Sequence, residues 1–301
     1  MSKMSVNLAG VTLKNPVMTA SGTFGSGAEY SEFVDLNHLG AVVTKGVANV
    51  PWPGNPTPRV AEVYGGMMNA IGLQNPGIDL FCKRDIPFLK KYDTKIIVNV
   101  CGHAPEEYLA VVERLADEPI DMMEINISCP NVNAGFLAFG QDAKHVEELT
   151  AQIKKIAKQP IIMKLTPNVT DITEIAKAAE AGGADALSLI NTLTGMKIDI
   201  NRRTFAVANK TGGVSGPVVH PIAVRMVYQT AQAVNIPIIG MGGIATPEDA
   251  IEMILAGASA VSVGTANFYN PNATIEIIDG IEAYMKKNGF ESVKDMVGIV
   301  K

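Results

Sequence analysis

Near the middle of the chain, a thiol lies between side chains that donate and accept hydrogen bonds. The stretch reads Glu124-Ile125-Asn126-Ile127-Ser128-Cys129-Pro130-Asn131. A cysteine thiol is a candidate nucleophile, and the asparagine amides on either side of it can both donate and accept hydrogen bonds. We interpret the stretch as a site that acts on a polar small molecule. The alternative is that Cys129 is only a small buried hydrophobe.

Lysines and asparagines stand at the ends of other apolar runs. Lys45 and Lys164 each close such a run, although lysine is rarely placed there for packing. Two cations suit an electron-rich ring that gains negative charge on reduction, or a carboxylate substrate; a structural ion pair is the alternative. Amides at strand ends can read the edge of a ring or can merely form turns. The asparagines are Asn99, Asn126 and Asn191.

Glycines follow the last two apolar runs. Gly240-Met241-Gly242-Gly243-Ile244-Ala245 matches the dinucleotide pattern G-x-G-x-x-A, but that site also needs an acidic residue at the end of the next strand. The next run, Ala260–Thr265, contains none, which argues against a nicotinamide site. We predict instead that these glycines and Gly264-Thr265 form a phosphate cradle of backbone N–H groups. The alternative is that glycine is needed only for tight turns.

Short apolar runs alternate with helical patterns, and these elements must position the polar residues. We predict eight strands, at Pro16–Thr19, Ala41–Thr44, Ile96–Val100, Asp121–Ile127, Ile161–Leu165, Ala186–Ile190, Ile236–Ile239 and Ala260–Val263. Amphipathic helices are predicted at Glu106–Leu115, Lys144–Ala157, Ile172–Ala181, Ile222–Ala233 and Pro247–Leu255, and a solvated outer helix at Asn272–Lys287. This alternation implies parallel pairing through crossover helices, and eight units favour a closed (β/α)8 TIM barrel over an open sheet.

A hairpin and two insertions accompany the predicted barrel. Val6–Leu8 and Val11–Leu13 alternate around a short turn, which predicts an N-terminal β-hairpin. Two long connections, Val47–Gly77 and Asn191–Pro221, each follow a strand, so both would lie over the C-terminal face of the barrel together with Cys129. No boundary composition splits the chain, and we expect residues 1–301 to form a single domain.

Composition narrows the class of protein. The 301 residues carry a formal net charge of -5, which provides no basic surface for a nucleic acid. The cysteines Cys82, Cys101 and Cys129 include no C-x-x-C pair, so we expect no disulfide framework and no zinc or iron-sulfur site. The N-terminus has no signal-peptide pattern, and no apolar run reaches the ~20 residues of a membrane helix. We expect a soluble, cytoplasmic protein without a membrane partner.

Several separate blocks have an order and spacing found in one enzyme family. They are Ala20–Gly25, Gly54–Arg59, Asn69–Gly77, Asn126–Asn131, Ile190–Thr192, Gly212–Pro217, Gly240–Gly243 and Gly264-Thr265. At these residues the chain resembles the dihydroorotate dehydrogenases, specifically the class 1B catalytic subunit, over essentially its whole length. The resemblance implies a barrel with one flavin mononucleotide (FMN) per chain that oxidises dihydroorotate to orotate in pyrimidine biosynthesis.

The resemblance also implies roles for the polar residues. Cys129 would be the general base that removes a proton from the substrate ring while hydride passes from the adjacent carbon to the flavin. Lys45 would contact flavin and substrate, and Lys164 would lie at the pyrimidine edge of the flavin. The substrate would be held by Lys45, Asn69, Ala70, Ile71, Gly72, Leu73, Asn126, Asn191 and Thr192. The cofactor would be held, without a metal, by Ser21, Lys45, Gly46, Asn99, Asn126, Lys164, Ile190, Gly216, Gly242, Gly243, Gly264 and Thr265.

Class 1B implies a partner, because such enzymes pass electrons to NAD through a second subunit that carries FAD and a 2Fe-2S cluster. The expected assembly is a heterotetramer around a homodimer core. This sequence contains neither cluster ligands nor a nicotinamide site, which agrees with a division of the redox chemistry between two subunits.

Two alternatives stay open. One is a class 1A homodimer that uses fumarate, which would lack the Gly54–Arg59 block, and the other is a non-redox phosphate-binding barrel.

Overall fold

Eight parallel strands form a closed barrel in the computed structural model, which describes residues 3–128 and 139–300. In spatial order the strands are β10, β15, β16, β3, β4, β7, β8 and β9, and β9 pairs with β10. Their bounds are β3 (Val17–Thr19), β4 (Ala41–Val43), β7 (Lys95–Val100), β8 (Met122–Asn126), β9 (Ile161–Lys164), β10 (Ala186–Leu189), β15 (Ile238–Met241) and β16 (Ala260–Val263). The predicted (β/α)8 fold class is confirmed.

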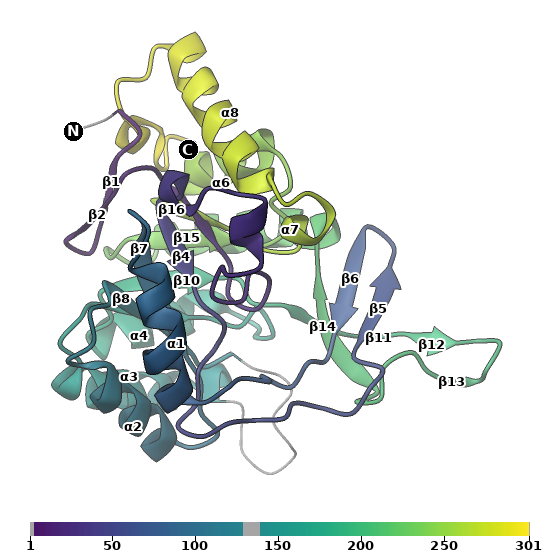
Figure 1. Ribbon diagram of the computed structural model, residues 1–301. Coiled ribbons are helices and arrows are strands. Elements are labelled where there is room, and N and C mark those ends of the chain that lie inside the picture. Colours follow the sequence, from purple (N-terminus) through teal and green to yellow (C-terminus); the bar gives the residue numbers. More distant parts are fainter. Residues whose placement is uncertain (1–2, 129–138, 301) are drawn as a thin grey trace.

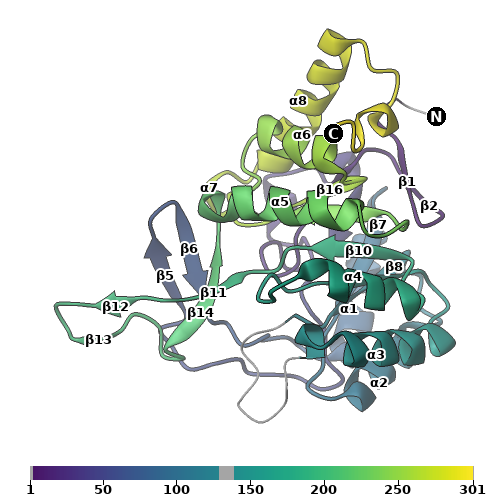
Figure 2. The same ribbon diagram turned by 180° about the vertical axis from the view of Figure 1, so that it is seen from behind.

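Helices surround the barrel (Figures 1 and 2). They are α1 (Ile78–Leu89), α2 (Pro105–Leu115), α3 (Ala143–Ile156), α4 (Ile172–Ala181), α5 (His220–Ala231), α6 (Pro247–Ala256), α7 (Ala266–Tyr269) and α8 (Ala273–Asn288). The sequence prediction lacks α1 and the short α7. A proline argues against a helix, and Pro87 lies near the C-terminal end of α1, where it removes one N–H donor from the last turn. Within the described ranges, no helix has the length and apolar character needed to cross a membrane.

The seventh barrel strand is shifted from its predicted position. The prediction was Ile236–Ile239, whereas β15 spans Ile238–Met241. Pro237 has no N–H to donate, and only its carbonyl joins the ladder, accepting from Leu187 N at 3.0 Å. Gly240 is therefore a strand residue that pairs with Val261, and the cradle loop begins two residues later.

The predicted N-terminal hairpin is confirmed. β1 (Val6–Leu8) and β2 (Val11–Leu13) pair antiparallel, with Val6 opposite Leu13. Leu8 and Leu13 are fully buried, and they belong to the same hydrophobic core as the barrel strands and outer helices. The hairpin is thus packed into the main core.

The two long insertions pair with each other, which the sequence did not predict. β5 (Val60–Val63) and β6 (Gly66–Asn69) come from the first insertion, and β11 (Leu193–Met196) and β14 (Thr211–Ser215) from the second. Together they form a four-stranded sheet in the order β11-β14-β6-β5, here called the insertion sheet. It stands beside the barrel, and the hairpin of β12 (Ile198–Asp199) and β13 (Thr204–Phe205) extends from it as a narrow arm (Figures 1 and 2).

Candidate active site

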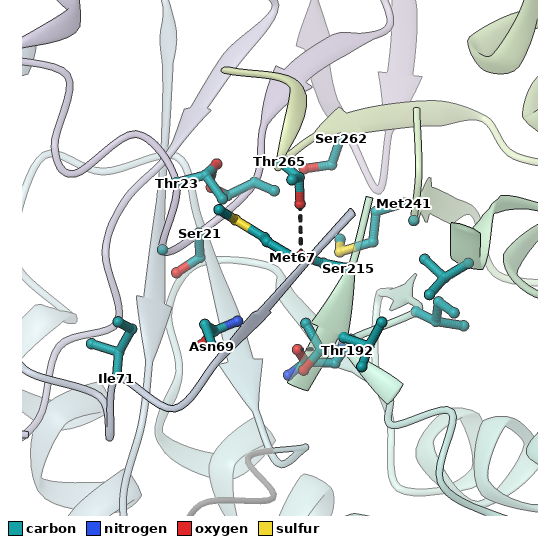
Figure 3. A pocket seen from close by; sticks show the side chains of 18 of the residues that line it. Ser21, Thr23, Met67, Asn69, Ile71, Thr192, Ser215, Met241, Ser262 and Thr265 are labelled. Atoms are coloured by element: carbon teal, nitrogen blue, oxygen red, sulfur yellow. Dashed lines mark hydrogen bonds between the residues drawn. The ribbon is translucent and has the colours of Figure 1, made fainter. Parts of the chain in front are cut away.

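A cavity of about 520 Å³ is lined by residues at the C-terminal ends of the barrel strands and by the insertion sheet. In Figure 3, Met241 and Ser262 reach into it from the barrel, and Met67 and Asn69 from the insertion sheet. Most of the predicted site residues line this cavity: Ser21, Lys45, Asn69, Ile71, Gly72, Leu73, Asn126, Lys164, Ile190, Asn191, Thr192, Gly242, Gly243, Gly264 and Thr265. Segments far apart in the sequence therefore meet here.

Other predicted site residues do not line the cavity. Ala70 is buried in a small second core within the insertion sheet region. Gly46 and Asn99 are buried against each other, and Gly216 packs closely against Gly66. Cys129 lies outside the described residues, three positions after the end of β8.

The strand that leads to Cys129 ends in a hydrogen-bonded cluster. Asn126, the last residue of β8, accepts through Oδ1 from Ser128 Oγ at 2.9 Å. Asn191 follows β10; its Nδ2 donates to Ser128 Oγ at 2.5 Å, and its Oδ1 accepts from Thr192 N at 2.7 Å. Because β8 and β10 are both barrel strands, their C-terminal ends present these amides at the same face. The cluster holds the chain in place up to Ser128.

A buried carboxylate inside the barrel connects four strands. Glu124 on β8 is 1% exposed. Its Oε2 accepts from Asn99 Nδ2 on β7 at 2.6 Å and from Lys164 Nζ on β9 at 3.4 Å, and its Oε1 accepts from Ser188 Oγ on β10 at 2.8 Å. Our sequence interpretation gave Glu124 no role. The sequence does contain a signal for this residue, which is an acidic side chain inside an apolar strand. Carboxylates are almost never fully buried unless they are paired, so this acid indicates a buried partner.

Asn99 is fully buried, yet its Oδ1 atom has no hydrogen-bond partner among the described residues. A carboxylate only accepts, so Glu124 orients the amide with Nδ2 toward itself and Oδ1 away. Oδ1 faces Gly46, where an added Cβ atom would lie 2.8 Å from it. Buried polar atoms without partners are uncommon in folded proteins, and this oxygen lies against the backbone of Gly46, outside the cavity lining.

Both predicted lysines line the cavity. Lys164 is the last residue of β9, and its side chain is 5% exposed. Its Nζ pairs with Glu124 Oε2 at 3.4 Å, so the structural ion pair is present. Because Lys164 also lines the cavity, its contact with a ligand stays a prediction. Lys45 lies two residues after β4. Its Nζ is close to Gly22, because a Cβ atom added to that glycine would lie 3.9 Å from it.

Glycine backbone lines part of the cavity. Gly242 and Gly243 follow β15 with φ of 125° and 72°, a conformation that favours glycine. The backbone N–H groups of Gly243, Gly264 and Thr265 donate no hydrogen bond within residues 3–128 and 139–300. Thr265 Oγ1 donates to Ser215 Oγ at 2.8 Å, which ties the barrel to the insertion sheet (Figure 3). These N–H groups are suited to an anion, as predicted for a phosphate cradle.

His220 supports the glycine loop and was missed by sequence reasoning. It is the first residue of α5 and is 7% exposed. Its Nδ1 lies 2.9 Å from the carbonyl oxygen of Gly242 and its Nε2 lies 3.1 Å from Glu252 Oε2. A carbonyl only accepts, so Nδ1 carries a proton. An added Cβ at Gly243 would be 2.7 Å from the His220 Cβ, so this support requires glycine at position 243.

Close contact between the two insertions shapes the opposite wall. Asn69 Nδ2 donates to the carbonyl of Gly213 at 3.4 Å, from β6 to β14. Thr192 lies so near Gly213 that an added Cβ there would overlap its Oγ1. Glycine is needed at position 213 because Thr192 approaches its backbone so closely. The pairing of β6 with β14 brings Asn69 and Thr192 to the cavity.

The cavity thus combines a cradle for an anion, two lysines, several amides and an apolar lining. Such a set suits a flat ring system that carries a phosphate, with a small polar molecule beside it. Among the residues that the structure describes, no group of three or more His, Cys, Asp or Glu side chains could hold a metal ion.

Comparisons with known proteins match the chain almost from end to end. The family model described as dihydroorotate dehydrogenase matches residues 3–285. A protein of Lachnoclostridium phytofermentans named dihydroorotate dehydrogenase B (NAD(+)), catalytic subunit, is 69% identical over 297 residues, which is 99% of each chain. Proteins of the same name from Alkaliphilus metalliredigens and Caldicellulosiruptor bescii are 64% and 52% identical, over 98% and 99% of both chains.

Proposed function

The chain belongs to the dihydroorotate dehydrogenase family, and on that premise we propose that it is the catalytic subunit of the NAD-linked class. It oxidises (S)-dihydroorotate to orotate in pyrimidine biosynthesis. The observation that carries this proposal is the 69% identity to a protein of that name over 99% of the chain. A polar cavity at the strand ends of a (β/α)8 barrel supports it, because active sites of this fold lie at that face.

We propose that the cavity binds FMN, which supplies the hydride acceptor when bound. The unpaired N–H groups of Gly243, Gly264 and Thr265 suit its phosphate. Lys164 lines the cavity and suits a ring edge that gains negative charge on reduction. Asn99 stands in the cofactor set through the family alone, because it is fully buried and does not line the cavity. The further cofactor contacts that we assign are Ser21, Lys45, Gly46, Asn126, Ile190, Gly216 and Gly242.

Dihydroorotate becomes orotate by losing a proton from one ring carbon and a hydride from its neighbour, which leaves a carbon–carbon double bond. We assign Cys129 as the base that takes the proton. Its place in the chain, just after the hydrogen-bonded pair Asn126 and Ser128, supports this assignment. We assign the substrate contacts to Lys45, Asn69, Ala70, Ile71, Gly72, Leu73, Asn126, Asn191 and Thr192. Ala70 stands in this set through the family alone, because its side chain lies in the second core.

We propose a partner subunit with FAD and a 2Fe-2S cluster that passes the electrons to NAD, in a heterotetramer around a homodimer of this chain. The words "catalytic subunit" in the names of the relatives support the existence of another subunit. We place the protein in the cytoplasm and treat residues 1–301 as one FMN-binding domain. The hydrophobic core that runs from Met4 to Met296 supports the single domain.

A visible absorption spectrum of the purified chain, followed by anaerobic addition of dihydroorotate, tests the proposal. We expect flavin absorbance that bleaches as orotate forms. A chain without flavin would refute the proposed cofactor, and flavin that dihydroorotate does not bleach would refute the substrate. Rapid reoxidation of the bleached flavin by fumarate would instead favour the class 1A alternative.

A further inference from the structure

We propose that Glu124 is a positioning residue that orients the Asn99 amide, holds the Lys164 ammonium, and sets the electrostatic potential at the flavin ring. This inference rests on the proposed function, because it requires FMN in the cavity. Glu124 itself does not line the cavity. It would therefore act through Lys164, which does line the cavity.

Three neighbouring strands supply the hydrogen-bond donors to Glu124. Asn99 lies directly opposite Glu124 in the β7–β8 register, and Ser188 lies opposite Lys164 in the β9–β10 register. Their polar atoms meet at the carboxylate at distances between 2.6 and 3.4 Å. Burying a carboxylate and an ammonium is unfavourable, and an apolar pair of similar volume often serves stability equally well. Packing alone therefore does not account for an acid at this position.

The first consequence is a fixed amide. With Nδ2 of Asn99 held by Glu124 at 2.6 Å, Oδ1 must point the other way, and it lacks a partner among the described residues. An unconstrained asparagine could present either its NH₂ group or its oxygen to a ligand. Glu124 removes that choice and turns the Asn99 acceptor toward the backbone of Gly46.

The second consequence is a shared cation. Lys164 Nζ lies 3.4 Å from Glu124 Oε2, which is longer than the roughly 2.7–2.9 Å of a tight charge-assisted hydrogen bond. An ammonium has three donors, and Lys164 also lines the cavity. Its charge is thus divided between the carboxylate and whatever occupies the cavity.

These two effects predict how Glu124 influences flavin reduction. Reduction adds negative charge to the ring, which Lys164 favours and the Glu124 carboxylate opposes. Replacing the carboxylate by a neutral group leaves the Lys164 charge uncompensated. The equilibrium should then shift toward reduced flavin.

The test is the variant Glu124→Gln, measured by anaerobic equilibration of its bound FMN with a reference dye of known potential. We expect the equilibrium constant for flavin reduction to rise at least tenfold, equivalent to about 30 mV for two electrons. Gln can also turn its NH₂ group toward Asn99, so we expect weaker FMN binding in a fluorescence titration. A dye equilibrium within twofold of the wild type would overturn the proposal.

Two further variants make the outcome decisive. Glu124→Asp keeps the negative charge but moves it away from Lys164 by one methylene group. The equilibrium constant for flavin reduction should therefore rise two- to tenfold. An unchanged constant would overturn the proposal, even if Glu124→Gln did not fold. Ser188→Ala removes a neutral contact to the same carboxylate, and its equilibrium constant for flavin reduction should stay within twofold of the wild type.

A wild-type chain without flavin would refute the proposed function itself. If dihydroorotate bleaches the flavin of every variant and all variants share the same equilibrium with the dye, only the role of Glu124 is refuted.

Discussion

Cys129 is the residue on which the proposed chemistry depends, and its neighbours restrict the chain that leads to it. Ser128 donates to Asn126 and accepts from Asn191, so side chains from two barrel strands hold the last residues before the thiol. A reacting group needs such a fixed approach, because small displacements of catalytic groups slow reactions strongly. Cys129 lies outside the described residues, and its role is best tested by substitution.

We expect Cys129→Ala to keep FMN and to bind orotate, because the alanine removes only the thiol. Anaerobic stopped-flow measurement of flavin reduction by dihydroorotate should show a rate lower by about 10²–10⁴, the usual contribution of a general base. Cys82→Ala is the matched control, since Cys82 lies in α1 outside the cavity lining. A Cys129→Ala rate equal to that of the wild type would assign the base to another residue.

The buried thiol of Cys82 predicts how the stability of the protein depends on pH. Burial raises the pKa of its thiol from 9.0 to about 11, and the nearby Glu118 carboxylate acts in the same direction. The folded protein therefore keeps this proton at pH values where the unfolded chain releases it. The Cys82 contribution to stability should be present below pH 9 and should be lost between pH 9 and about pH 11.

Urea unfolding at several pH values measures this effect. Other groups titrate in the same range, so the comparison is with Cys82→Ala, whose unfolding free energy should fall less steeply between pH 9 and pH 11. Parallel pH profiles for the two proteins would contradict the prediction. Iodoacetamide should also fail to modify Cys82 at pH 8 unless the protein is unfolded, because the thiolate is the nucleophile.

At the scale of elements, the cavity depends on the pairing of β6 with β14. These strands belong to insertions that follow different barrel strands, and their pairing sets Gly213 opposite Asn69. The absence of a side chain at Gly213 leaves room for Thr192. The register of the insertion sheet therefore positions Asn69 and Thr192, which we propose as substrate contacts.

We expect Gly213→Ala to weaken orotate binding by about tenfold, because the added methyl group displaces Thr192 and Asn69. Overpacking of this kind costs about 1–3 kcal/mol, and 1.4 kcal/mol corresponds to tenfold in affinity. The flavin should remain bound. Orotate titration monitored by the flavin spectrum gives the dissociation constant.

The control for Gly213→Ala is Thr194→Ala. Thr194 lies opposite Gly213 on β11 and is exposed, outside the cavity lining. This variant perturbs the same strand pair without filling the space beside Thr192. Equal loss of affinity in both variants would point to a general weakening of the sheet and would contradict the specific steric role of Gly213.

At the scale of the whole molecule, a core built from strands, helices and hairpin carries a cavity that suits FMN. Cys82 and Cys101, which lie in the described part of the chain, are both buried. Similar proteins are named dihydroorotate dehydrogenase B (NAD(+)), catalytic subunit. Oxidation of dihydroorotate and reduction of NAD would then occur on different subunits.

We expect the isolated chain to reduce an artificial dye with dihydroorotate as donor but to leave NAD unreduced. Addition of an iron-sulfur and FAD-containing partner subunit should establish NAD reduction, because that subunit provides the path for electrons. The assay follows NADH absorbance with and without the partner, and the dye reaction serves as the control for an intact site. NAD reduction by the isolated chain would refute the proposed division of labour.

Most of the barrel was predictable from local sequence. Short apolar runs and amphipathic segments show their periodicity in the local sequence, so all eight barrel strands and the outer helices other than α1 and α7 were predicted. Among the strands, only β15 was shifted, because of Pro237. Lys45, Lys164, Asn126 and Asn191 were also identified from the sequence, because parallel strands of a closed barrel end at one face and polar residues at those ends must meet there.

Tertiary structure alone decided which distant residues touch. The pairing of the two insertions, the support of Gly242 by His220, and the carboxylate of Glu124 between Asn99 and Lys164 all join residues separated by long stretches of chain. Periodicity reports the environment along one element, and it carries no information on the register or side-chain partner of another. The sequence therefore indicated a reactive site around Cys129 and named Asn99 and Lys164, whereas the carboxylate of Glu124 that joins them was recognised only from the tertiary structure.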